Sequence, residues 1–480
     1  MIKESSHINV KASEENPSPK EVDLDKKASQ NPFTSRSLIL IGTFLLLFGS
    51  VFSLFYFNPY FEQIRIERLD GVGGNTLLYL GLTLLAANVT FLLYIFVLYL
   101  RYKVVPTVSD DALPNTTVIV PAYNEGALVY KTLMSLAESD FPEKKLQIIS
   151  IDDGSQDDTW NWMMKAKAEL GKRVAIYQQP ENKGKREALY RGFHLATGAV
   201  FVTVDSDSLV KKDTLRNMVS PFVVNPQAGA VAGNVRVLNR KKALIPRMLN
   251  VSFAFSFEFI RSAQSALGAV FCTPGALSAY RKTAVMNCLE DWINQTFMGQ
   301  ASTIGEDRAM TNMILKQGYH VFFQRNAFVY TNIPERYKNL NKMFTRWERS
   351  NVRETIAMSR FAFGNFRKGS KIGIRLLLLY YWSRLLLAIP MLLLMLAYIV
   401  MYPLLFLNST LIGILIFSSV QAFFYAKKHD ISDSFWAYPY SLFYAFTLFW
   451  IRPYAILTAN RSGWLTRELP KVRKKLTDPR

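Results

Sequence analysis

The sequence is poor in cysteine and in charge for its length, and both shortages narrow the class of protein. Only two cysteines, Cys272 and Cys288, occur among its 480 residues. That number excludes a disulfide-rich scaffold, and no Cys/His cluster has the spacing of a zinc site. Charged residues make up 20% of the chain and hydrophobic residues 50%. This balance indicates a protein with a membrane part.

The formal net charge is +20, which by itself could indicate a nucleic-acid partner. However, much of the excess lies beside long apolar runs. There, Lys and Arg mark the cytoplasmic side of a membrane and attract anionic lipid. No nucleic-acid-binding motif accompanies the charge. We therefore expect membrane lipids among the partners, and no nucleic acid.

Two long runs without a charged residue, Ser37–Phe57 and Asn75–Leu100, precede the soluble part of the chain. Each is long enough to span a bilayer, which takes about 20 apolar residues. The segment before the first run is rich in Ser, Lys, Glu and Pro, and we expect it to be disordered. Arg101 and Lys103 follow the second run, which places the tail and the next domain in the cytoplasm.

Three further uncharged runs follow the soluble part: Leu385–Leu407, Asn408–Ala426 and Ser434–Ile451. The last is short and need not cross. The preceding "KIGIRLLLLYYWSR" contains Arg375 and Arg384 and suits an interfacial helix. The expected division is a disordered cytoplasmic tail (1–36), two transmembrane helices (37–100), a soluble domain (106–335), interfacial helices (336–384), C-terminal transmembrane or interfacial helices (385–459) and a basic cytoplasmic tail (460–480).

The soluble part has the pattern of an α/β domain. Short β-branched runs, "TTVIVPAYNE", "LQIISIDDGS", "RVAIYQQP" and "AVFVTVDSDS", each end in turn-forming or acidic residues. Helical patterns at Ala127–Ser139 and Thr159–Leu170 lie between them. Such alternation predicts a mostly parallel sheet with its chemistry at the carboxyl ends of the strands.

The first two strand ends have polar side chains suited to a nucleoside. Tyr123 and Glu125 follow one strand, and Asp152 and Asp153 follow the next. A uracil ring offers one N–H donor between two carbonyls, and a ribose offers two hydroxyls, so carboxylates and an aromatic suit both. Alternatively, "DDGS" only caps a helix.

The next two segments suit a diphosphate. "NKGKREAL" opens a helix with Lys185, and a diphosphate is bound by cations and helix-terminal N–H groups together. A solvated basic turn is the alternative. After the fourth strand, Asp205 and Asp207 lie one residue apart in "VDSDS". They predict Mg²⁺ or Mn²⁺ bound together with a nucleotide diphosphate.

Two later segments contain candidate catalytic residues. "TIGEDRAMTNMIL" places Glu306 and Asp307 at a helix start, where a carboxylate either caps the helix or serves as a general base. "MFTRWERSNVRE" sets Arg346 beside Trp347, and Arg can hold a phosphate while Trp stacks on a sugar. An amphipathic helix at the membrane surface is the alternative for this second segment.

Taken together, "PAYNE", "DDGS", "GKRE", "DSD", "TPGALSAYR", "GEDR" and "RW" resemble the processive membrane glycosyltransferases of family 2. The stretch Cys272–Asn312 is similar to the hyaluronan synthases, and the wider group includes chitin synthases and rhizobial chitooligosaccharide synthases. "SGWLTR" near the C-terminus also resembles a segment of that group.

The resemblance implies a nucleotide-sugar-binding, Rossmann-like (GT-A) cytoplasmic domain inserted between transmembrane helices of a multi-pass plasma-membrane protein. It implies an inverting hexosyltransferase that adds GlcNAc, GlcA or both from a UDP-sugar to a growing β-linked polysaccharide and moves the polymer across the membrane. The site residues it implies are Asp307 with Glu306 for catalysis; Tyr123, Glu125, Asp152, Asp153, Lys185, Asp205 and Arg346 for the nucleotide sugar; Cys272, Thr273, Gly275 and Trp347 for the acceptor; and Asp207 with Asp205 for Mg²⁺ or Mn²⁺.

The chain departs from the family pattern at two positions. Met343 replaces the glutamine of Gln-x-x-Arg-Trp, and Leu465 replaces a glycine in the C-terminal segment. Because methionine cannot make the hydrogen bonds of glutamine, single transfer to a lipid-linked acceptor remains an alternative to polymerisation. A third possibility is a membrane component that binds a UDP-sugar or a polysaccharide without turnover, although Asp205, Asp207 and Asp307 argue against it.

Overall fold

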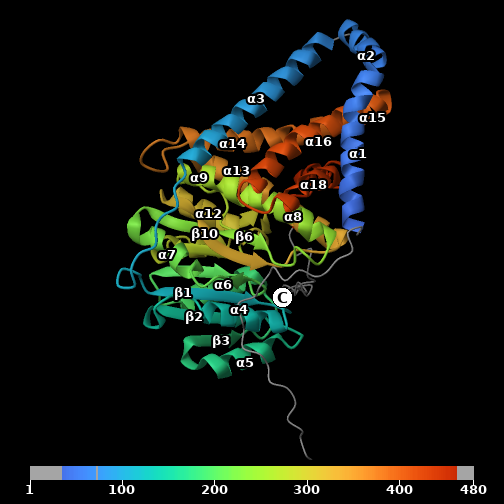
Figure 1. Ribbon diagram of the computed structural model, residues 1–480. Coiled ribbons are helices and arrows are strands. Elements are labelled where there is room, and N and C mark those ends of the chain that lie inside the picture. The colour runs from blue at the N-terminus through green and yellow to red at the C-terminus, as the bar shows by residue number, and fades with distance from the viewer. Residues whose placement is uncertain (1–34, 72–73, 462–480) are drawn as a thin grey trace, which may run out of the picture.

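A computed structural model describes residues 35–71 and 74–461 of the chain (Figure 1). Its soluble part is built on an eight-stranded sheet in the order β3-β2-β1-β4-β7-β6-β10-β5. The strands are β1 Thr116–Ala122, β2 Leu146–Asp152, β3 Val174–Gln178, β4 Val200–Val204, β5 Leu209–Val210, β6 Ala228–Val237, β7 Leu277–Arg281 and β10 His320–Thr331. A two-stranded hairpin, β8 Thr296–Phe297 with β9 Gln300–Ala301, lies apart from this sheet.

The predicted α/β domain with a mostly parallel sheet is confirmed. Strands β1, β2, β3 and β4 pair in parallel, as do β6 and β10. β7 runs antiparallel between β4 and β6, and β5 runs antiparallel to β10. β1, β4 and β6 are buried along their whole length, which explains their nearly unbroken apolar sequences.

Helices cover the sheet. α6 packs on β1 and β2, and α7 packs on β6 and β10. The predicted helix Ala127–Ser139 is observed as Ala127–Ala137, and Thr159–Leu170 is observed with the expected bounds. The helices of this part are α4 Ala127–Ala137, α5 Thr159–Leu170, α6 Lys185–Leu195, α7 Thr214–Val224, α8 Leu244–Ala254, the π-helix η3 Phe255–Ile260, α9 Arg261–Ala266, α10 Lys282–Met286, α11 Leu289–Ile293, α12 Glu306–Lys316 and α13 Tyr337–Ala362, with short 3₁₀ turns η1 Glu143–Lys145 and η2 Gly171–Arg173.

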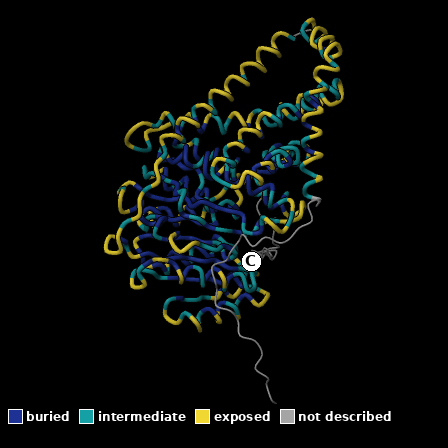
Figure 2. Tube along the Cα trace, viewed as in Figure 1, coloured by how far each residue is buried: buried dark blue, intermediate teal, exposed yellow. Residues whose placement is uncertain are grey.

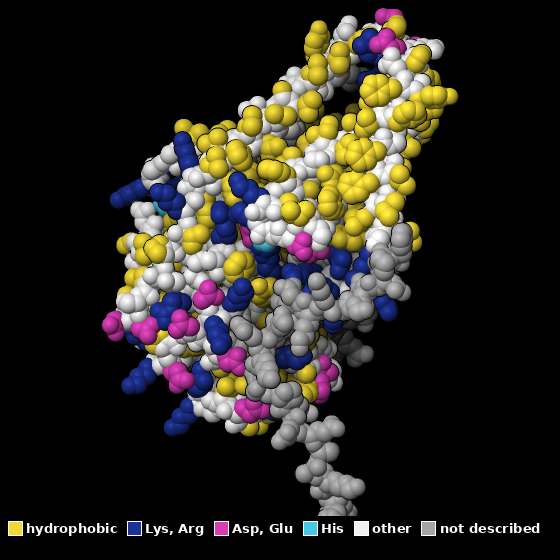
Figure 3. Space-filling view, in the orientation of Figure 1, with side chains coloured by type: hydrophobic (Ala, Val, Ile, Leu, Met, Phe, Trp, Pro, Cys, Tyr) yellow, Lys and Arg dark blue, Asp and Glu magenta, His cyan; other side chains and the backbone are white. Residues whose placement is uncertain are grey.

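The apolar helices stand on one side of the sheet domain (Figure 1). α1 Ser35–Tyr56 rises away from it, α2 Asn58–Asp70 lies at the far end, and α3 Gly74–Arg101 returns. Both long helices are mostly exposed (Figure 2), and three helices in the described part of the chain are long and apolar enough to cross a membrane: Arg36–Tyr56, Gly74–Arg101 and Pro403–Ala426. Apolar side chains cover this region, and many Lys and Arg side chains gather beneath it (Figure 3).

The C-terminal helices differ from the expected spans. The run Leu385–Leu407 is interrupted twice: α14 Ile372–Leu386 and α15 Ala388–Met401 meet at a 44° bend, and Tyr402 separates α15 from α16. Pro390 has no N–H to donate to the carbonyl of Leu386, which accounts for the bend.

The next helix, α16 Pro403–Ala426, begins five residues before the expected start at Asn408. Its first residue is a proline, which is favoured in the first turn of a helix. The last run, Ser434–Ile451, is divided among short elements rather than one span. These are α17 Ile431–Ser434, α18 Ala437–Phe443, the π-helix η4 Tyr444–Leu448 and α19 Ile451–Leu457. The N-terminal tail through residue 34 and the "SGWLTR" segment lie outside the described residues.

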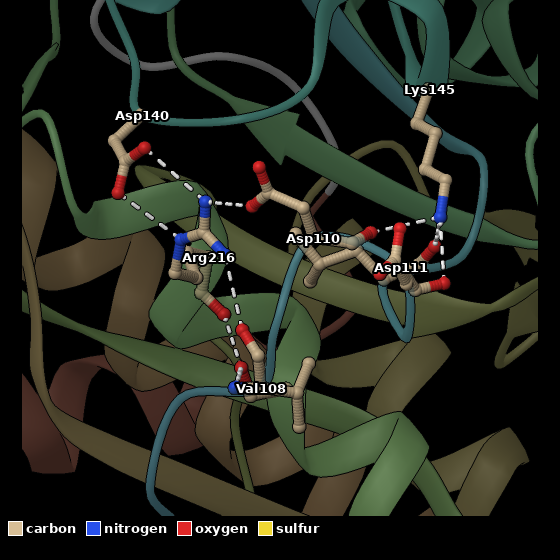
Figure 4. A network of polar contacts seen from close by, with 8 residues as sticks. Val108, Asp110, Asp111, Asp140, Lys145 and Arg216 are labelled. Carbon is tan, nitrogen blue, oxygen red and sulfur yellow. Dashed lines mark hydrogen bonds and ion pairs between the residues drawn. The ribbon is translucent and has the colours of Figure 1, made fainter.

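The connection between α3 and β1 is clamped to the domain (Figure 4). The Arg216 guanidinium forms ion pairs with Asp110 (2.5 Å) and Asp140 (3.1 Å) and donates to the Val108 carbonyl (3.0 Å). The Lys145 ammonium donates to three main-chain carbonyls of the same connection, including those of residues 110 and 111. The orientation of α3 is therefore tied to the sheet.

We predict that Arg216→Ala loosens this connection. The carbonyl and the two carboxylates lose a shared donor, so the unfolding temperature should fall and residues 103–113 should become sensitive to limited proteolysis. Arg65→Ala removes an exposed ion pair with Glu62 on α2 and serves as the matched control, with little change expected. Equal protease resistance in the two variants would contradict the clamp.

Candidate active site

The loop after β1 is held against the loop after β2. Asn124 has a positive φ of 52°, and its side-chain oxygen accepts from the Gln156 N–H (2.8 Å). The hydroxyl of Thr159 accepts from the N–H groups of Glu125 and Gly126, both at 2.8 Å. Tyr123 and Glu125 thus lie on a loop fixed by its neighbours at the carboxyl edge of the sheet, as the sequence predicts.

Asp152 and Asp153 are both buried and hydrogen-bonded within the protein. Asp152 accepts from the main chain and hydroxyl of Ser155 (3.1 and 2.5 Å) and from the Gln178 side chain (2.9 Å). Asp153 accepts from the N–H groups of residues 183 (3.0 Å) and 184 (2.8 Å), and burial raises its pKa to about 6. Asp153 therefore fixes the loop that leads into α6.

Lys185, at the start of α6, joins two carboxylates from distant parts of the chain. Its Nζ lies 2.5 Å from Asp205 Oδ1 and 3.1 Å from Glu306 Oε1. Burial alone would lower the pKa of Lys185, but these two carboxylates together raise it well above its ordinary value. The ammonium is therefore charged, and it supplies the positive charge that Asp205 requires.

Gly275 makes this contact possible. A Cβ atom at this position would lie 2.6 Å from Lys185 Nζ and 3.6 Å from both carboxylate oxygens of Asp205. The Gly275 N–H also donates to Asp307 Oδ2 (3.3 Å). The glycine therefore lets the loop before β7 touch the ion pair and the candidate base at once.

Glu306 and Asp307 are adjacent, but their environments move their pKa values in opposite directions. Burial alone would raise the pKa of Glu306, but Lys185 and Arg346 outweigh it and the pKa is lowered. The pKa of Asp307 is raised, first by burial and then by the charge of Glu306. A carboxylate with a raised pKa beside one that stays ionised suits a general base.

Cys272 lies next to this base. Its Sγ is 3.7 Å from Asp307 Oδ2, and burial raises the pKa of the thiol to about 12, with the Asp307 charge adding to the effect. The thiol therefore stays protonated and is not a nucleophile.

Thr273, which the sequence predicts to lie at the acceptor, has a fully buried side chain. Its hydroxyl is 2.9 Å from both the Tyr280 hydroxyl and the Thr311 hydroxyl. Thr273 therefore ties the loop before β7 to α12, and its role is to position that loop.

Helix α13 carries the Arg–Trp pair. Trp347 is 43% exposed and packs edge-on against Phe344 (5.6 Å between ring centres), and Arg346 is close enough to Glu306 to lower the pKa of that carboxyl. Met343, which replaces the family glutamine, is buried in the main core of the domain. Its side chain therefore contributes packing at this position.

The other two arginines of the motif turn away from the site. Arg349 donates to the Thr458 hydroxyl (3.0 Å), and Arg353 donates to the carbonyls of Ala459 (2.6 Å) and Arg461 (2.8 Å). They hold the C-terminal end of α19, where unpaired carbonyls need donors.

The residues predicted to bind a metal fit a divalent ion only in part. Within the described residues, no group of three or more His, Cys, Asp or Glu side chains is arranged to hold a metal. Asp207 accepts from the Thr331 and Ser208 hydroxyls (3.3 and 3.4 Å), while Asp205 is paired with Lys185. Two carboxylates fit Mg²⁺ or Mn²⁺ provided that a diphosphate supplies the remaining oxygens.

Two residues that shape the site, Trp292 and Gly305, were not identified from the sequence. The Trp292 indole donates to the Glu306 carbonyl (2.8 Å) and its ring stacks with Arg186. Gly305 has a φ of 75° and lies against Ser350 of α13, so a side chain at 305 would collide with that serine. The glycine before "ED" was a usable signal, since positive φ at a helix start favours glycine, but nothing in the sequence identified Trp292.

We predict that Gly275→Ala separates Lys185 from Asp205. The added methyl group meets the flexible end of a lysine, so the unfolding temperature should change little while the 2.5 Å contact is lost. A structure of the variant would measure the distance from Nζ to Oδ1. Ala276→Gly, at the adjacent position, adds no atom and serves as the control. An unchanged distance in Gly275→Ala would contradict the role given to the glycine.

Part of the chain is similar in sequence to known proteins. The profile described as glycosyltransferase-like family 2 matches residues 114–350. An N-acetylglucosaminyltransferase of Rhizobium meliloti (strain 1021) is 31% identical over 249 residues, which is 52% of this chain and 58% of that protein. A hyaluronan synthase of Streptococcus pyogenes is 31% identical over 243 residues, 50% of this chain and 57% of that protein.

The chain thus spans less than two thirds of the length of these relatives. Among solved structures, a mannosyltransferase from Pyrobaculum calidifontis in complex with GDP-Man and Mn²⁺ is 19% identical at a TM-score of 0.46, covering 88% of this chain and 96% of that chain. The family match includes each strand of the eight-stranded sheet and the start of α13. Residues 114–350 therefore form a domain of glycosyltransferase family 2.

Proposed function

We propose that the protein is an inverting, metal-dependent hexosyltransferase that adds GlcNAc, GlcA or both from a UDP-sugar to the end of a β-linked, hyaluronan- or chitin-like polysaccharide. The observation that carries this proposal is the pairing of Asp307, a carboxyl with a raised pKa, with the Lys185–Asp205–Glu306 cluster. An in-line displacement at a sugar diphosphate requires a base for the acceptor hydroxyl and positive charge for the departing diphosphate, which Asp307 and Lys185 can supply.

In this mechanism Asp307 takes the proton of an acceptor hydroxyl as its oxygen attacks the anomeric carbon, and the bond to the diphosphate breaks on the opposite side. Tyr123, Glu125 and the loop fixed by Asp152 and Asp153 bind the nucleoside. Lys185 and Arg346 hold the departing diphosphate through charge. Asp205 and Asp207 would hold the divalent cation. When bound, the cation would neutralise negative charge on the departing diphosphate.

The acceptor lies, in this proposal, between the Cys272–Gly275 loop and Trp347. Trp347 is half-exposed next to Arg346, and an exposed indole can stack on a sugar ring. Gly275 brings the loop to the base, while Thr273 acts from within the core by holding that loop.

We also propose that the protein is a multi-pass plasma-membrane enzyme with its sheet domain in the cytoplasm, in contact with membrane lipids, and that it moves the polymer outward. Three membrane-length helices and the Lys and Arg side chains beneath them support this orientation (Figure 3). Single transfer to a lipid-linked acceptor is the second candidate, and the burial of Met343 favours it, because that position offers the acceptor no hydrogen bond.

The test is incubation of membranes containing the protein with labelled UDP-GlcNAc, with and without UDP-GlcA, in Mg²⁺ or Mn²⁺. We expect a high-molecular-weight, glycosidase-sensitive product, and we expect Asp307→Asn to lower its rate of formation by about 10²–10⁴-fold. Asp291→Asn, on α11, removes a carboxylate outside the site and is the matched control. A short lipid-linked product would favour single transfer. If no donor is used, the proposal fails.

The pH dependence gives an independent prediction. Asp307 must be deprotonated to accept a proton, and its pKa is raised, so the rate should fall on acidification at a higher pH than an ordinary aspartate would give. Glu306→Gln removes the charge that contributes to this shift, so the acidic limb of the rate profile should move to lower pH. Glu290→Gln, on α11, should leave the limb in place. A limb that stays fixed or moves upward in Glu306→Gln would contradict the assignment.

A further inference from the structure

Arg261 lies close to the proposed base but has no part in the mechanism above. It begins α9 directly after the π-helix η3, and its guanidinium carbon lies 3.6 Å from the centre of the Phe257 ring. Short π-helices redirect the side chains that follow them and are frequent at functional sites. Here the turn sets Arg261 flat against an aromatic face, which fixes the direction of its N–H groups.

One of those N–H groups has no acceptor. Arg261 Nη1 is buried, and no residue within 35–71 or 74–461 accepts a hydrogen bond from it. A buried charged donor without an acceptor is costly, and a bound ligand is one arrangement that would satisfy it. The alternative interpretation is a structural arginine held by the Phe257 ring and by its hydrogen bond with Cys272.

The surroundings of Arg261 favour a ligand. The Arg261 side chain is hydrogen-bonded to Cys272, which places it beside the loop before β7. Cys272 in turn lies 3.7 Å from Asp307. Arg308, the other guanidinium next to Cys272, has both terminal nitrogens engaged, on Asn351 and Thr355.

We propose that Arg261 is a further acceptor-binding residue, whose Nη1 donates a hydrogen bond to an oxygen of the terminal acceptor sugar beside Asp307. This inference rests on the proposed glycosyl transfer. The bond fixes the sugar ring, so that one of its hydroxyls points at the base. A sugar hydroxyl and a uronate carboxylate both offer the required oxygen.

The experiment uses the full chain in detergent or membranes, with UDP-GlcNAc as donor and a short β-linked GlcNAc oligosaccharide as acceptor. For Arg261→Gln we expect the acceptor KM to rise by roughly 10- to 100-fold, the loss of one hydrogen bond from a charged donor. UDP affinity by calorimetry should equal that of the parent, because Arg261 does not contact the nucleotide. Arg261→Lys keeps the charge and should recover part of the loss.

Arg325→Gln is the matched control. Arg325 is also stacked on an aromatic ring, that of Tyr102 at 4.6 Å, and also has a buried nitrogen without an acceptor, but its guanidinium donates to Ser262 rather than bonding Cys272. Its acceptor KM should match the parent. If Arg261→Gln leaves the acceptor KM within about twofold of the parent, or if Arg261→Gln and Arg325→Gln change it equally, Arg261 is structural and the inference is wrong.

Two arms separate the possible outcomes. An effect confined to acceptors that end in GlcA identifies a carboxylate contact, whereas an equal effect on GlcNAc-ended acceptors identifies a hydroxyl. Should Arg261→Gln fail to fold, Arg261→Lys decides, because its ammonium is expected to restore the bond only in part and an acceptor KM equal to that of the parent would overturn the inference. Absence of any transfer by the parent protein would instead reject the proposed function itself.

Discussion

The site depends on one buried ammonium. Lys185 lies between Asp205 after β4 and Glu306 at the start of α12, and without it two carboxylates would face each other in a largely dehydrated space. Buried like charges of this kind cannot both stay ionised. The charge of the lysine lowers the pKa of Glu306, whereas burial and the charge of Glu306 raise the pKa of Asp307, so the two adjacent acids differ in proton affinity.

The same ion pair organises the backbone around it. Its two carboxylates come from segments about a hundred residues apart, and Gly275 supplies a third segment that approaches the ammonium closely. Behind these segments, buried hydroxyls and the Trp292 indole hold the loop before β7 and the start of α12 in place. The positions of the candidate catalytic side chains thus depend on polar contacts within the core.

The sequence predicted the strand ends well and the side-chain partners poorly. Asp152 and Asp205 lie at one sheet edge because β2 and β4 run parallel to β1, and this follows from alternation. Glu306 lies at the start of α12 and reaches Asp205 through Lys185, which alternation does not predict. It does not follow from alternation that Lys185, rather than a metal, would be the near neighbour of Asp205. Burial was also not predictable from composition: Thr273 and Met343 both lie in the core, where their side chains pack against the protein. The bend between α14 and α15 could have been predicted from Pro390. The role of Trp292 could not, because it depends on contacts with Arg186 and Glu306 that no sequence pattern indicates.

Helix α13 connects the two halves of the molecule. Its 26 residues make a rod about 39 Å long; Arg346 and Trp347 lie in its first half, and Arg349 and Arg353 grip the end of α19. Glu348 adds an ion pair to Arg452 of α19, 3.0 Å in length. Because α13 is one continuous helix, a change in the tilt of α19 would shift the position of Trp347. Helix α13 also packs on α12, so the same tilt would reach the helix that begins at Glu306 and Asp307.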